Sequence, residues 1–124
     1  MRAKILNASA GSGKTYQLAY KYVRDVIDQP GLYRHILAVT FTNKATEEMK
    51  SRILKEIHRL ASGGASPYLG NLCRELSLDE RSVRKRAAEV RSKILHDYSR
   101  FTVLTIDTFF QRILRAFIKE LGID

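Results

Sequence analysis

The chain has 124 residues, 44% of them hydrophobic and 28% charged, which is typical of one globular domain or part of one. Its net charge of +9 favours a polyanionic partner such as nucleic acid or a nucleotide, with a basic protein lacking such a partner as the alternative. Cys73 is the only cysteine, which excludes an internal disulfide, and no apolar run has the length of a signal peptide or membrane span; we therefore expect a cytoplasmic protein with no membrane contact.

A short apolar segment and a glycine-rich loop begin the chain. Lys4–Asn7 is predicted to be the end of a strand, and the loop "ASAGSGKT" follows it directly. After Lys14, apolar residues recur at helical spacing until the Pro-Gly pair at 30–31 stops the helix. The expected buried face of this helix is Leu18, Ala19, Tyr22, Val23, Val26 and Ile27.

The loop matches three of the four fixed positions of the phosphate-binding pattern G-x-x-x-x-G-K-[ST], and Ala8 stands at the first position. In such a loop, backbone N–H groups grip phosphate oxygens, the lysine reaches the β- and γ-phosphates, and the threonine hydroxyl binds Mg²⁺. The alternative is a strand-to-helix turn that binds nothing, which explains the glycines but not a lysine directly before a threonine. The predicted nucleotide-binding residues are Ala8, Ser9, Ala10, Gly11, Ser12, Gly13, Lys14 and Thr15.

A second strand and helix follow. Ile36–Thr40 is a continuous apolar run that suits a buried parallel strand. Asn43 can cap the next helix, on whose solvent side Glu48 and Arg52 are spaced to form an ion pair. The expected buried stripe is Ala45, Met49, Ile53, Ile57 and Leu60.

The middle of the chain predicts a helical insertion. Residues 62–67 form a linker, Tyr68–Leu76 a short helix, and Ser77 with Glu80 a capping box for a longer helix. The opposite face of that longer helix is rich in Arg and Lys, for which a solvated surface and a nucleic-acid site are both open. Its expected buried residues are Val83, Ala87, Val90, Ile94, Leu95 and Tyr98.

A third strand and helix complete the pattern. Val103–Ile106 is a buried-strand candidate, Asp107 can cap the helix that follows, and Gly122 is a plausible helix stop. Strands separated by helices predict an α/β fold with a parallel sheet. The expected apolar stripe of the last helix is Phe109, Ile113, Leu114, Phe117, Ile118 and Leu121.

Two further segments resemble helicase motifs. "AVTFTNKATEEM" at 38–49 is similar to the motif after the second strand in superfamily 1 helicases of the UvrD/Rep type. "TIDTFFQRILRAF" at 105–117 resembles the next motif of that family, particularly in the RecB/AddA branch of helicase-nucleases, and "ASAGSGKT" also reads like that branch. The three motifs occur in the family's order, so the chain resembles the N-terminal segment of such a helicase.

The resemblance implies part of a RecA-like P-loop NTPase domain, three-layered, with 1–61 and 101–124 around a helical insertion at 62–100. It implies binding of ATP and Mg²⁺, with Thr15 on the metal, and movement along single-stranded DNA. Both new segments begin at carboxyl ends of strands, where open α/β sheets bind ligands. The residues that the resemblance places along DNA are Phe41, Thr42, Asn43, Lys44, Thr105, Asp107 and Phe109.

These residues also have purely structural interpretations. Phe41 can be a core residue rather than a stacking platform for a base, and Asn43 and Asp107 can be helix caps. Phe109 and Phe110 are expected to divide, one in the core and one toward a site. The three histidines have no partner at metal-ligand spacing, so we expect no metal site apart from the Mg²⁺ that accompanies ATP.

The chain also departs from the family pattern. No Gln precedes the loop, so adenine specificity is not predicted, and Asp79-Glu80 begins a helix rather than ending a strand. A second RecA-like domain and a nuclease domain are not among these residues. We therefore expect an N-terminal piece of a larger helicase, with exposed apolar surface, no catalytic residue on the fragment and negligible ATP hydrolysis. The expected partner is the missing remainder of the helicase, with a separate nuclease protein as a further candidate.

Two other functions share the same loop. A small P-loop phosphotransferase acting on a metabolite needs a lid with arginines, which the arginine-rich helix could mimic. A non-catalytic DNA-binding module with a vestigial ATP loop predicts DNA affinity that does not depend on Lys14.

Overall fold

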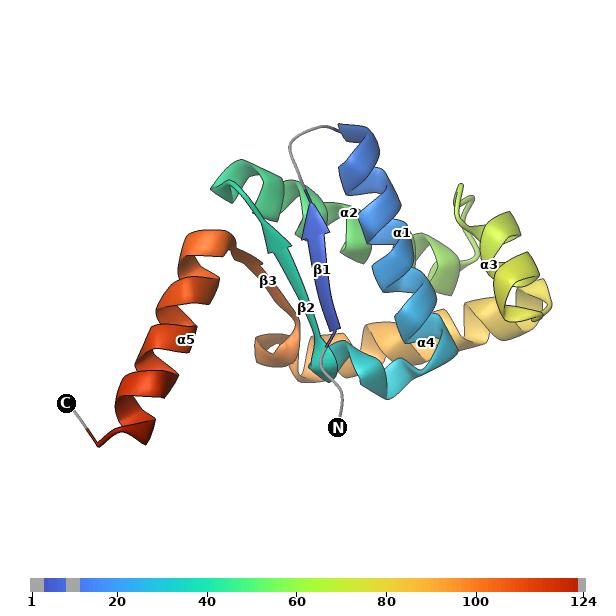
Figure 1. Ribbon diagram of the computed structural model, residues 1–124. Helices are drawn as coiled ribbons and strands as arrows, with labels where there is room; N and C mark the ends of the chain where they lie inside the picture. The colour runs from blue at the N-terminus through green and yellow to red at the C-terminus, as the bar shows by residue number, and fades with distance from the viewer. Residues whose placement is uncertain (1–3, 9–11, 123–124) are drawn as a thin grey trace.

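The structure is a computed structural model that describes residues 4–8 and 12–122, with side chains described from residue 14 onward. Strands β1 (Lys4–Ala8), β2 (Ile36–Thr40) and β3 (Thr102–Thr105) form one parallel sheet in the order β1-β2-β3 (Figure 1). The helices are α1 (Ser12–Asp28), α2 (Asn43–Ser62), α3 (Leu69–Leu76), α4 (Glu80–His96) and α5 (Ile106–Glu120). The predicted order of strands and helices is confirmed.

Short 3-10 helices precede β2 and β3, at Pro30–His35 and Tyr98–Arg100. The Pro-Gly pair follows the end of α1, as predicted. Pro30 is also the first residue of the short helix Pro30–His35, because the fixed φ of proline is compatible with the first turn of a helix. None of the helices in the described ranges combines the length and hydropathy that a bilayer span requires.

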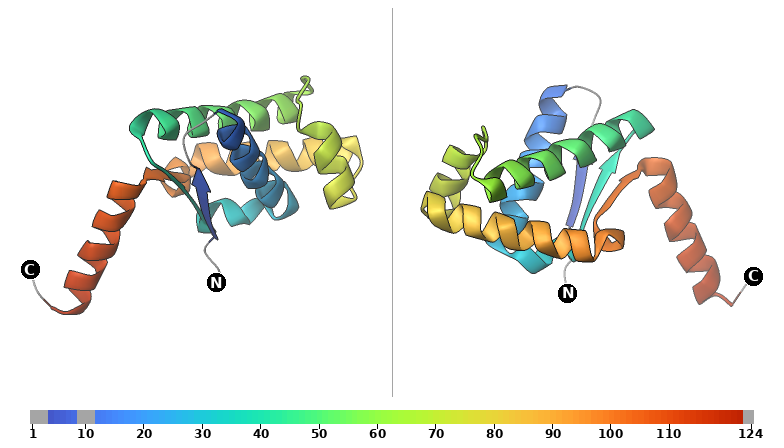
Figure 2. Two further views of the ribbon diagram at one scale, coloured as in Figure 1. Left: turned by 45° about the horizontal axis from the view of Figure 1, so that its top comes forward. Right: turned by 180° about the vertical axis from the view of Figure 1, so that it is seen from behind.

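One hydrophobic core lies between the sheet and the helices α1, α2 and α4 (Figure 2). Ile36, Ala38 and Val103, from one pleat of the strands, join the same buried cluster as the apolar helix faces. The helical members of this cluster are Ala19, Tyr22, Val23, Val26, Ile27, Met49, Ile53, Ile57, Leu60, Leu72, Val83, Ala87, Val90 and Ile94. Most of the apolar stripes predicted for α1, α2 and α4 are therefore confirmed.

The opposite pleat of the sheet is less covered: Val39 of the central strand is buried, but Leu37 and Leu104 are only partly buried. Within the described residues, helices cover one face of the sheet, so this part of the chain has two layers rather than the expected three. The strands follow one another across the sheet in chain order, which places successive right-handed crossover helices on the same face.

The helical segment α3–α4 lies against α1 and α2, and α4 runs alongside α2 (Figure 2). Asp79 caps α4, because its carboxylate accepts a hydrogen bond from the N–H of Ser82 at 2.8 Å. The predicted capping box is therefore wrong: Ser77 instead adopts a left-handed φ of 54° and ends α3. Leu95 and Tyr98 were expected in the core, and this prediction is wrong: Leu95, in the last turn of α4, is 71% exposed, and Tyr98, in the short helix before β3, is 49% exposed.

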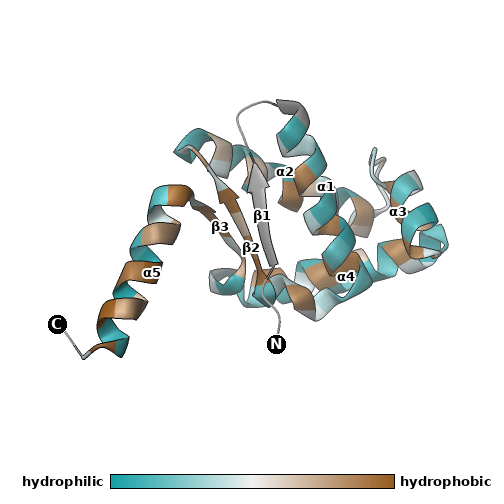
Figure 3. Cartoon of the chain, in the orientation of Figure 1, coloured by the Kyte–Doolittle hydropathy of each residue, from teal (hydrophilic) through white to brown (hydrophobic). Residues whose placement is uncertain are grey.

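The last helix, α5, extends away from the rest of the molecule (Figures 1 and 2). Its predicted apolar stripe is exposed rather than packed against the core: Leu114 and Phe117 are each 57% exposed. Figure 3 shows the resulting apolar band along α5. Gly122 follows α5 with a φ of 73°, as predicted for a helix stop. The expected exposed apolar surface is therefore present.

One core side chain carries an unsatisfied hydroxyl. Tyr22 is fully buried, its ring contacts Phe101 edge-on at 5.6 Å between centroids, and its hydroxyl has no hydrogen-bond partner within the described part of the chain. Burial raises the pKa of this phenol well above its ordinary value. Tyr33, in the same core, instead donates to Asp97 Oδ2 at 2.9 Å.

We predict that Tyr22→Phe increases the free energy of unfolding by about 1 kcal/mol, because it removes a buried polar group that nothing compensates. The matched change Tyr33→Phe should decrease it by about 1 kcal/mol, because it breaks a hydrogen bond. Urea denaturation of both variants measures the difference. A destabilised Tyr22→Phe would show that this hydroxyl is satisfied in solution.

Candidate nucleotide and nucleic-acid site

The carboxyl ends of the three strands lie side by side at one edge of the sheet. Ala8 of β1 pairs with Thr40 of β2, and Thr40 pairs with Thr105 of β3. Because all three strands are parallel, the segments that follow them leave from the same edge (Figure 1). The helices α1, α2 and α5 begin close to these strand ends, so three positive helix-dipole ends gather there. This edge therefore favours the binding of anions.

The predicted phosphate-binding loop connects β1 to α1 at this edge. Ser9, Ala10 and Gly11 lie outside the described residues, and only the backbone of Ala8, Ser12 and Gly13 is described. The Lys14 side chain is exposed in the first turn of α1, whereas Thr15 is 8% exposed. The lysine ammonium is thus accessible to an anion at the N-terminus of this helix.

The segment after β2 is exposed over the four residues Phe41–Lys44. Phe41 is 51% exposed, so it is not a core residue. Thr42 caps α2, because its hydroxyl accepts a hydrogen bond from the N–H of Ala45 at 3.0 Å. The prediction that Asn43 is the cap is therefore wrong; Asn43 is the first helical residue, and its exposed side chain lies on the same segment as Phe41.

Two buried hydroxyls that were not predicted from the sequence hold this segment in place. The Oγ1 atoms of Thr40 and Thr46 lie 2.6 Å apart, and both hydroxyls reach the carbonyl of Thr42, at 3.2 and 3.1 Å. Thr40 ends β2 and Thr46 lies in the first turn of α2, so this network fixes how the strand leads into the helix. The threonines at 40, 42 and 46 are the sequence signal for it.

In the segment after β3, a threonine again caps the helix that follows the strand. Thr105 caps α5, because its Oγ1 accepts from the N–H of Thr108 at 3.3 Å. Asp107 was predicted as the cap; the structure instead places it, exposed, in the first helical turn. The expected division of the two phenylalanines is also wrong, since Phe109 is half-buried, Phe110 is 58% exposed, and neither belongs to the buried core.

An open groove of about 490 Å³ lies between the start of α1 and one side of α2. Arg52 forms part of its wall, with its guanidinium carbon 5.5 Å from the centre of the Tyr16 ring. Arg52 also donates to Glu56 at 3.2 Å, whereas the helical spacing predicted a pair with Glu48. The groove adjoins the predicted phosphate-binding loop and is lined by Thr15, Tyr16, Glu47, Glu48, Ser51, Arg52 and Lys55.

The arginine-rich helix α4 uses two of its arginines to bind the ends of other helices. Arg84 donates to the carbonyls of Leu60 at 3.1 Å and Gly64 at 3.0 Å, at the C-terminus of α2. Arg86 donates to the carbonyls of Ile27 and Asp28, at the C-terminus of α1. Cations at helix C-termini satisfy carbonyls that lack an intrahelical partner. These two arginines are therefore structural and do not form a lid over a nucleotide.

Within the described ranges, no group of three or more His, Cys, Asp or Glu side chains is arranged to hold a metal ion. The His58 ring nitrogen Nδ1 lies 3.1 Å from Arg91, and His96 Nδ1 lies 2.7 Å from the carbonyl of Ser92.

Comparison with known proteins identifies the family to which the chain belongs. Residues 2–124 match the family described as the UvrD/REP helicase N-terminal domain. The chain is 31% identical over 127 residues to the RecBCD enzyme subunit RecB of Escherichia coli K12, which covers 96% of this chain and 11% of that protein. It is 29% identical over 120 residues to an ATP-dependent helicase/nuclease subunit of Lactobacillus delbrueckii subsp. bulgaricus, covering 97% of this chain and 8% of that protein. No solved structure gives a significant match.

The fold and the site together define an α/β chain that presents a lysine-bearing helix start, an exposed segment after β2 and a partly exposed segment after β3 at the carboxyl edge of a parallel sheet. The chain belongs to the UvrD/REP helicase N-terminal domain family. It spans about a tenth of the length of the curated relatives it matches.

We predict that Arg84→Ala lowers the free energy of unfolding by about 1–3 kcal/mol, because it leaves carbonyls at the end of α2 without their donor. The control Arg81→Ala removes an exposed arginine from the same helix and should change this free energy by less than about 0.5 kcal/mol. Urea titrations of both variants provide the comparison. Equal effects would contradict the structural role of Arg84.

Proposed function

We propose that the chain is the ATP-binding segment of a RecA-like P-loop domain, in an ATP-dependent DNA helicase or helicase-nuclease that moves along single-stranded DNA in repair or recombination. The register of the sheet carries this proposal, because it brings the segments after Ala8, Thr40 and Thr105 to one edge. The family and the helicase-nuclease relatives support DNA as the second ligand. In this proposal, 1–61 and 101–124 form the edge, and 62–100 is a helical insertion.

The nucleotide half of the site would be the loop Ala8–Thr15. The backbone N–H groups at the start of α1 would hold the phosphates, and the exposed Lys14 ammonium would neutralise their charge. The Thr15 hydroxyl would contact the Mg²⁺ that accompanies ATP. A single protein hydroxyl fits an ion that takes its other ligands from phosphates and water.

The DNA half would be the exposed segment after β2 and the partly exposed segment after β3, at the same edge. Phe41 would stack on a base, and Thr42 and Asn43 at the start of α2 would hold a phosphate, with Lys44 adding positive charge. Thr105, Asp107 and Phe109 would line the neighbouring position along the strand. Stacking and backbone contacts of this kind do not depend on base sequence, as translocation requires.

We assign no catalytic residue within these 124 residues. The chain alone is therefore expected to bind nucleotide without appreciable hydrolysis. Its partners would be single-stranded DNA and the remainder of a longer helicase chain, with a separate nuclease protein as a further candidate. Such a protein would act in the cytoplasm, which agrees with a chain that has one cysteine.

We predict that Lys14→Ala weakens ATP binding at least about tenfold, because it removes a charge-assisted contact to phosphate. The control Lys21→Ala removes another exposed lysine of α1 and should leave ATP affinity unchanged. Binding is measured by calorimetry, and circular dichroism checks that both variants are folded. ATP affinity unchanged in Lys14→Ala would contradict the nucleotide site.

DNA affinity that responds to neither Lys14→Ala nor nucleotide would favour a non-catalytic DNA-binding module.

We predict that Phe41→Ala weakens binding to a single-stranded oligonucleotide by about 1–3 kcal/mol for each stacked base. Its stability should change little, because Phe41 is exposed. Tyr98→Ala is the control, since Tyr98 is also exposed but precedes β3 and so lies away from the carboxyl edge. Fluorescence anisotropy with a labelled oligonucleotide measures the effect. Equal losses in both variants would show that aromatic exposure, rather than position at this edge, determines binding.

A further inference from the structure

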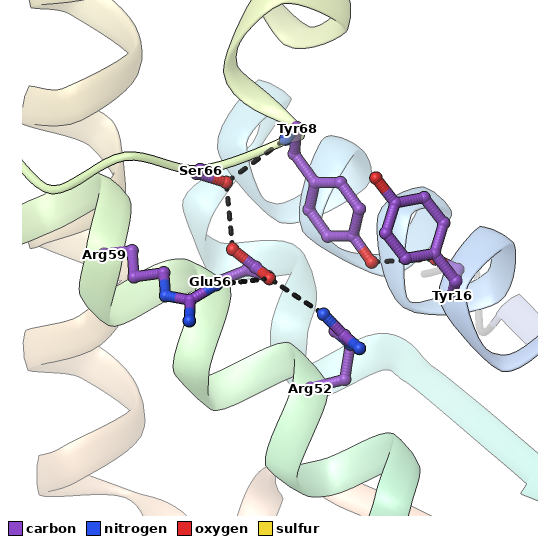
Figure 4. A network of polar contacts seen from close by, with 6 residues as sticks. All are labelled: Tyr16, Arg52, Glu56, Arg59, Ser66 and Tyr68. Carbon is purple, nitrogen blue, oxygen red and sulfur yellow. Dashed lines mark hydrogen bonds and ion pairs between the residues drawn. The ribbon is translucent and has the colours of Figure 1, made fainter. Parts of the chain in front are cut away.

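A ring of contacts connects the helical insertion to the start of α1, directly beside the proposed phosphate-binding loop (Figure 4). The Tyr68 hydroxyl donates to the carbonyl of Tyr16 at 2.8 Å. The two aromatic rings also meet edge-on, with centroids 5.0 Å apart. Tyr16 follows the Lys14-Thr15 pair in the sequence, so this hydrogen bond holds the peptide next to the residues proposed to bind phosphate.

A buried carboxylate completes the ring from the other side. Glu56 is fully buried, and its Oε2 accepts from Arg52 and Arg59 at 3.2 Å each. Its Oε1 accepts from the Ser66 hydroxyl at 3.0 Å, and the Ser66 oxygen accepts from the N–H of Tyr68 at 3.2 Å. A buried carboxylate that has three donors is costly to disturb, because the loss of any one leaves charge uncompensated.

Arg52 links this carboxylate back to Tyr16. Its guanidinium lies over the Tyr16 ring at 5.5 Å and donates to Glu56, so one side chain contacts both. The resulting ring runs Tyr16, Arg52, Glu56, Ser66, Tyr68 and back to Tyr16. It fixes the linker after α2 and the beginning of α3 against the first turn of α1.

Tyr16 also separates two grooves. The groove of about 490 Å³ lies on its α2 side, and a second groove, of about 560 Å³, lies on its α3 side. Tyr16 is therefore a wall of both grooves, so a displacement of Tyr16 changes the groove that starts at Thr15 as well as the groove beside α3. Burial raises the pKa of Tyr68 above its ordinary value, so its hydroxyl remains a protonated donor at neutral pH.

We infer that Tyr68 is a positioning residue for triphosphate binding: through the Tyr16 carbonyl, it holds the first turn of α1 in the geometry that the phosphates require. The inference rests on the proposed nucleotide site and extends it to a residue of the helical insertion. The energetic coupling between two events is reciprocal. If the docking of α3 favours nucleotide binding, nucleotide at the loop must equally favour the docking of α3.

The test is Tyr68→Phe, which removes the hydroxyl and keeps the ring contacts with Tyr16. We expect the dissociation constant for ATP to rise about fivefold, the equivalent of one net hydrogen bond. The control is Tyr33→Phe, which removes another hydroxyl bonded to the helical segment, at Asp97 and far from the loop. Tyr33→Phe should lower the free energy of unfolding about as much as Tyr68→Phe does, but its dissociation constant for ATP should stay within about twofold of the wild-type value. The comparison therefore separates a positioning effect on ATP binding from a general loss of stability.

Two further measurements use the same ring. Ser66→Ala breaks the link between Glu56 and Tyr68 but leaves the Tyr68 hydroxyl in place, and it should also weaken ATP binding. Hydrogen exchange of the wild-type chain should show ATP protecting Tyr68–Leu76, and Tyr68→Phe should reduce that protection.

The outcomes separate this inference from the proposed function. If the wild-type chain binds ATP and Lys14→Ala does not, but Tyr68→Phe binds as tightly as wild type, the positioning role is wrong and the nucleotide site stands. If ATP leaves exchange at Tyr68–Leu76 unchanged, the positioning role is also wrong. If the wild-type chain binds no ATP, the proposed site and this inference both fail.

Discussion

The in-register parallel pairing of three strand ends constrains everything else in this chain. Thr40 lies between Ala8 and Thr105 in the sheet, so the segments after all three positions must leave from a common edge. The Thr40 hydroxyl also reaches Thr46 and the Thr42 carbonyl, which ties the central strand to the helix that follows it. A shift of one residue at β2 would exchange the buried and exposed pleats and remove Thr40 from this network.

The charged groups of the helical insertion are largely used within the fold. Arg84 and Arg86 bind carbonyls at the ends of α2 and α1, and Glu75 accepts a contact from Arg24 of α1. The basic character of α4 is therefore partly explained by helix docking and gives little evidence of a nucleic-acid surface. Exposed positive charge is also present near the strand ends, at Lys14 and Lys44 beside the starts of α1 and α2.

The strands and long helices could be predicted from apolar periodicity alone, but the residues that begin the helices could not. Several polar residues near each strand end can act as caps, and the periodicity does not distinguish Thr42 from Asn43 or Thr105 from Asp107, although the structure uses the threonine in both cases. Arginines three and four residues from Glu56 were visible in the sequence, yet its burial also depends on Ser66, ten residues away. Long-range contacts of that kind leave no periodic signal.

The exposed helix α5 has a consequence for how the molecule melts. It contacts the rest of the chain mainly at β2 and β3, next to its own N-terminus, while most of its length has no neighbour in the described structure. A helix of 15 residues is marginal in water without tertiary packing. Its backbone amides should therefore open as a separate unit of low local stability, well before the cooperative transition of the core that α1, α2 and α4 share.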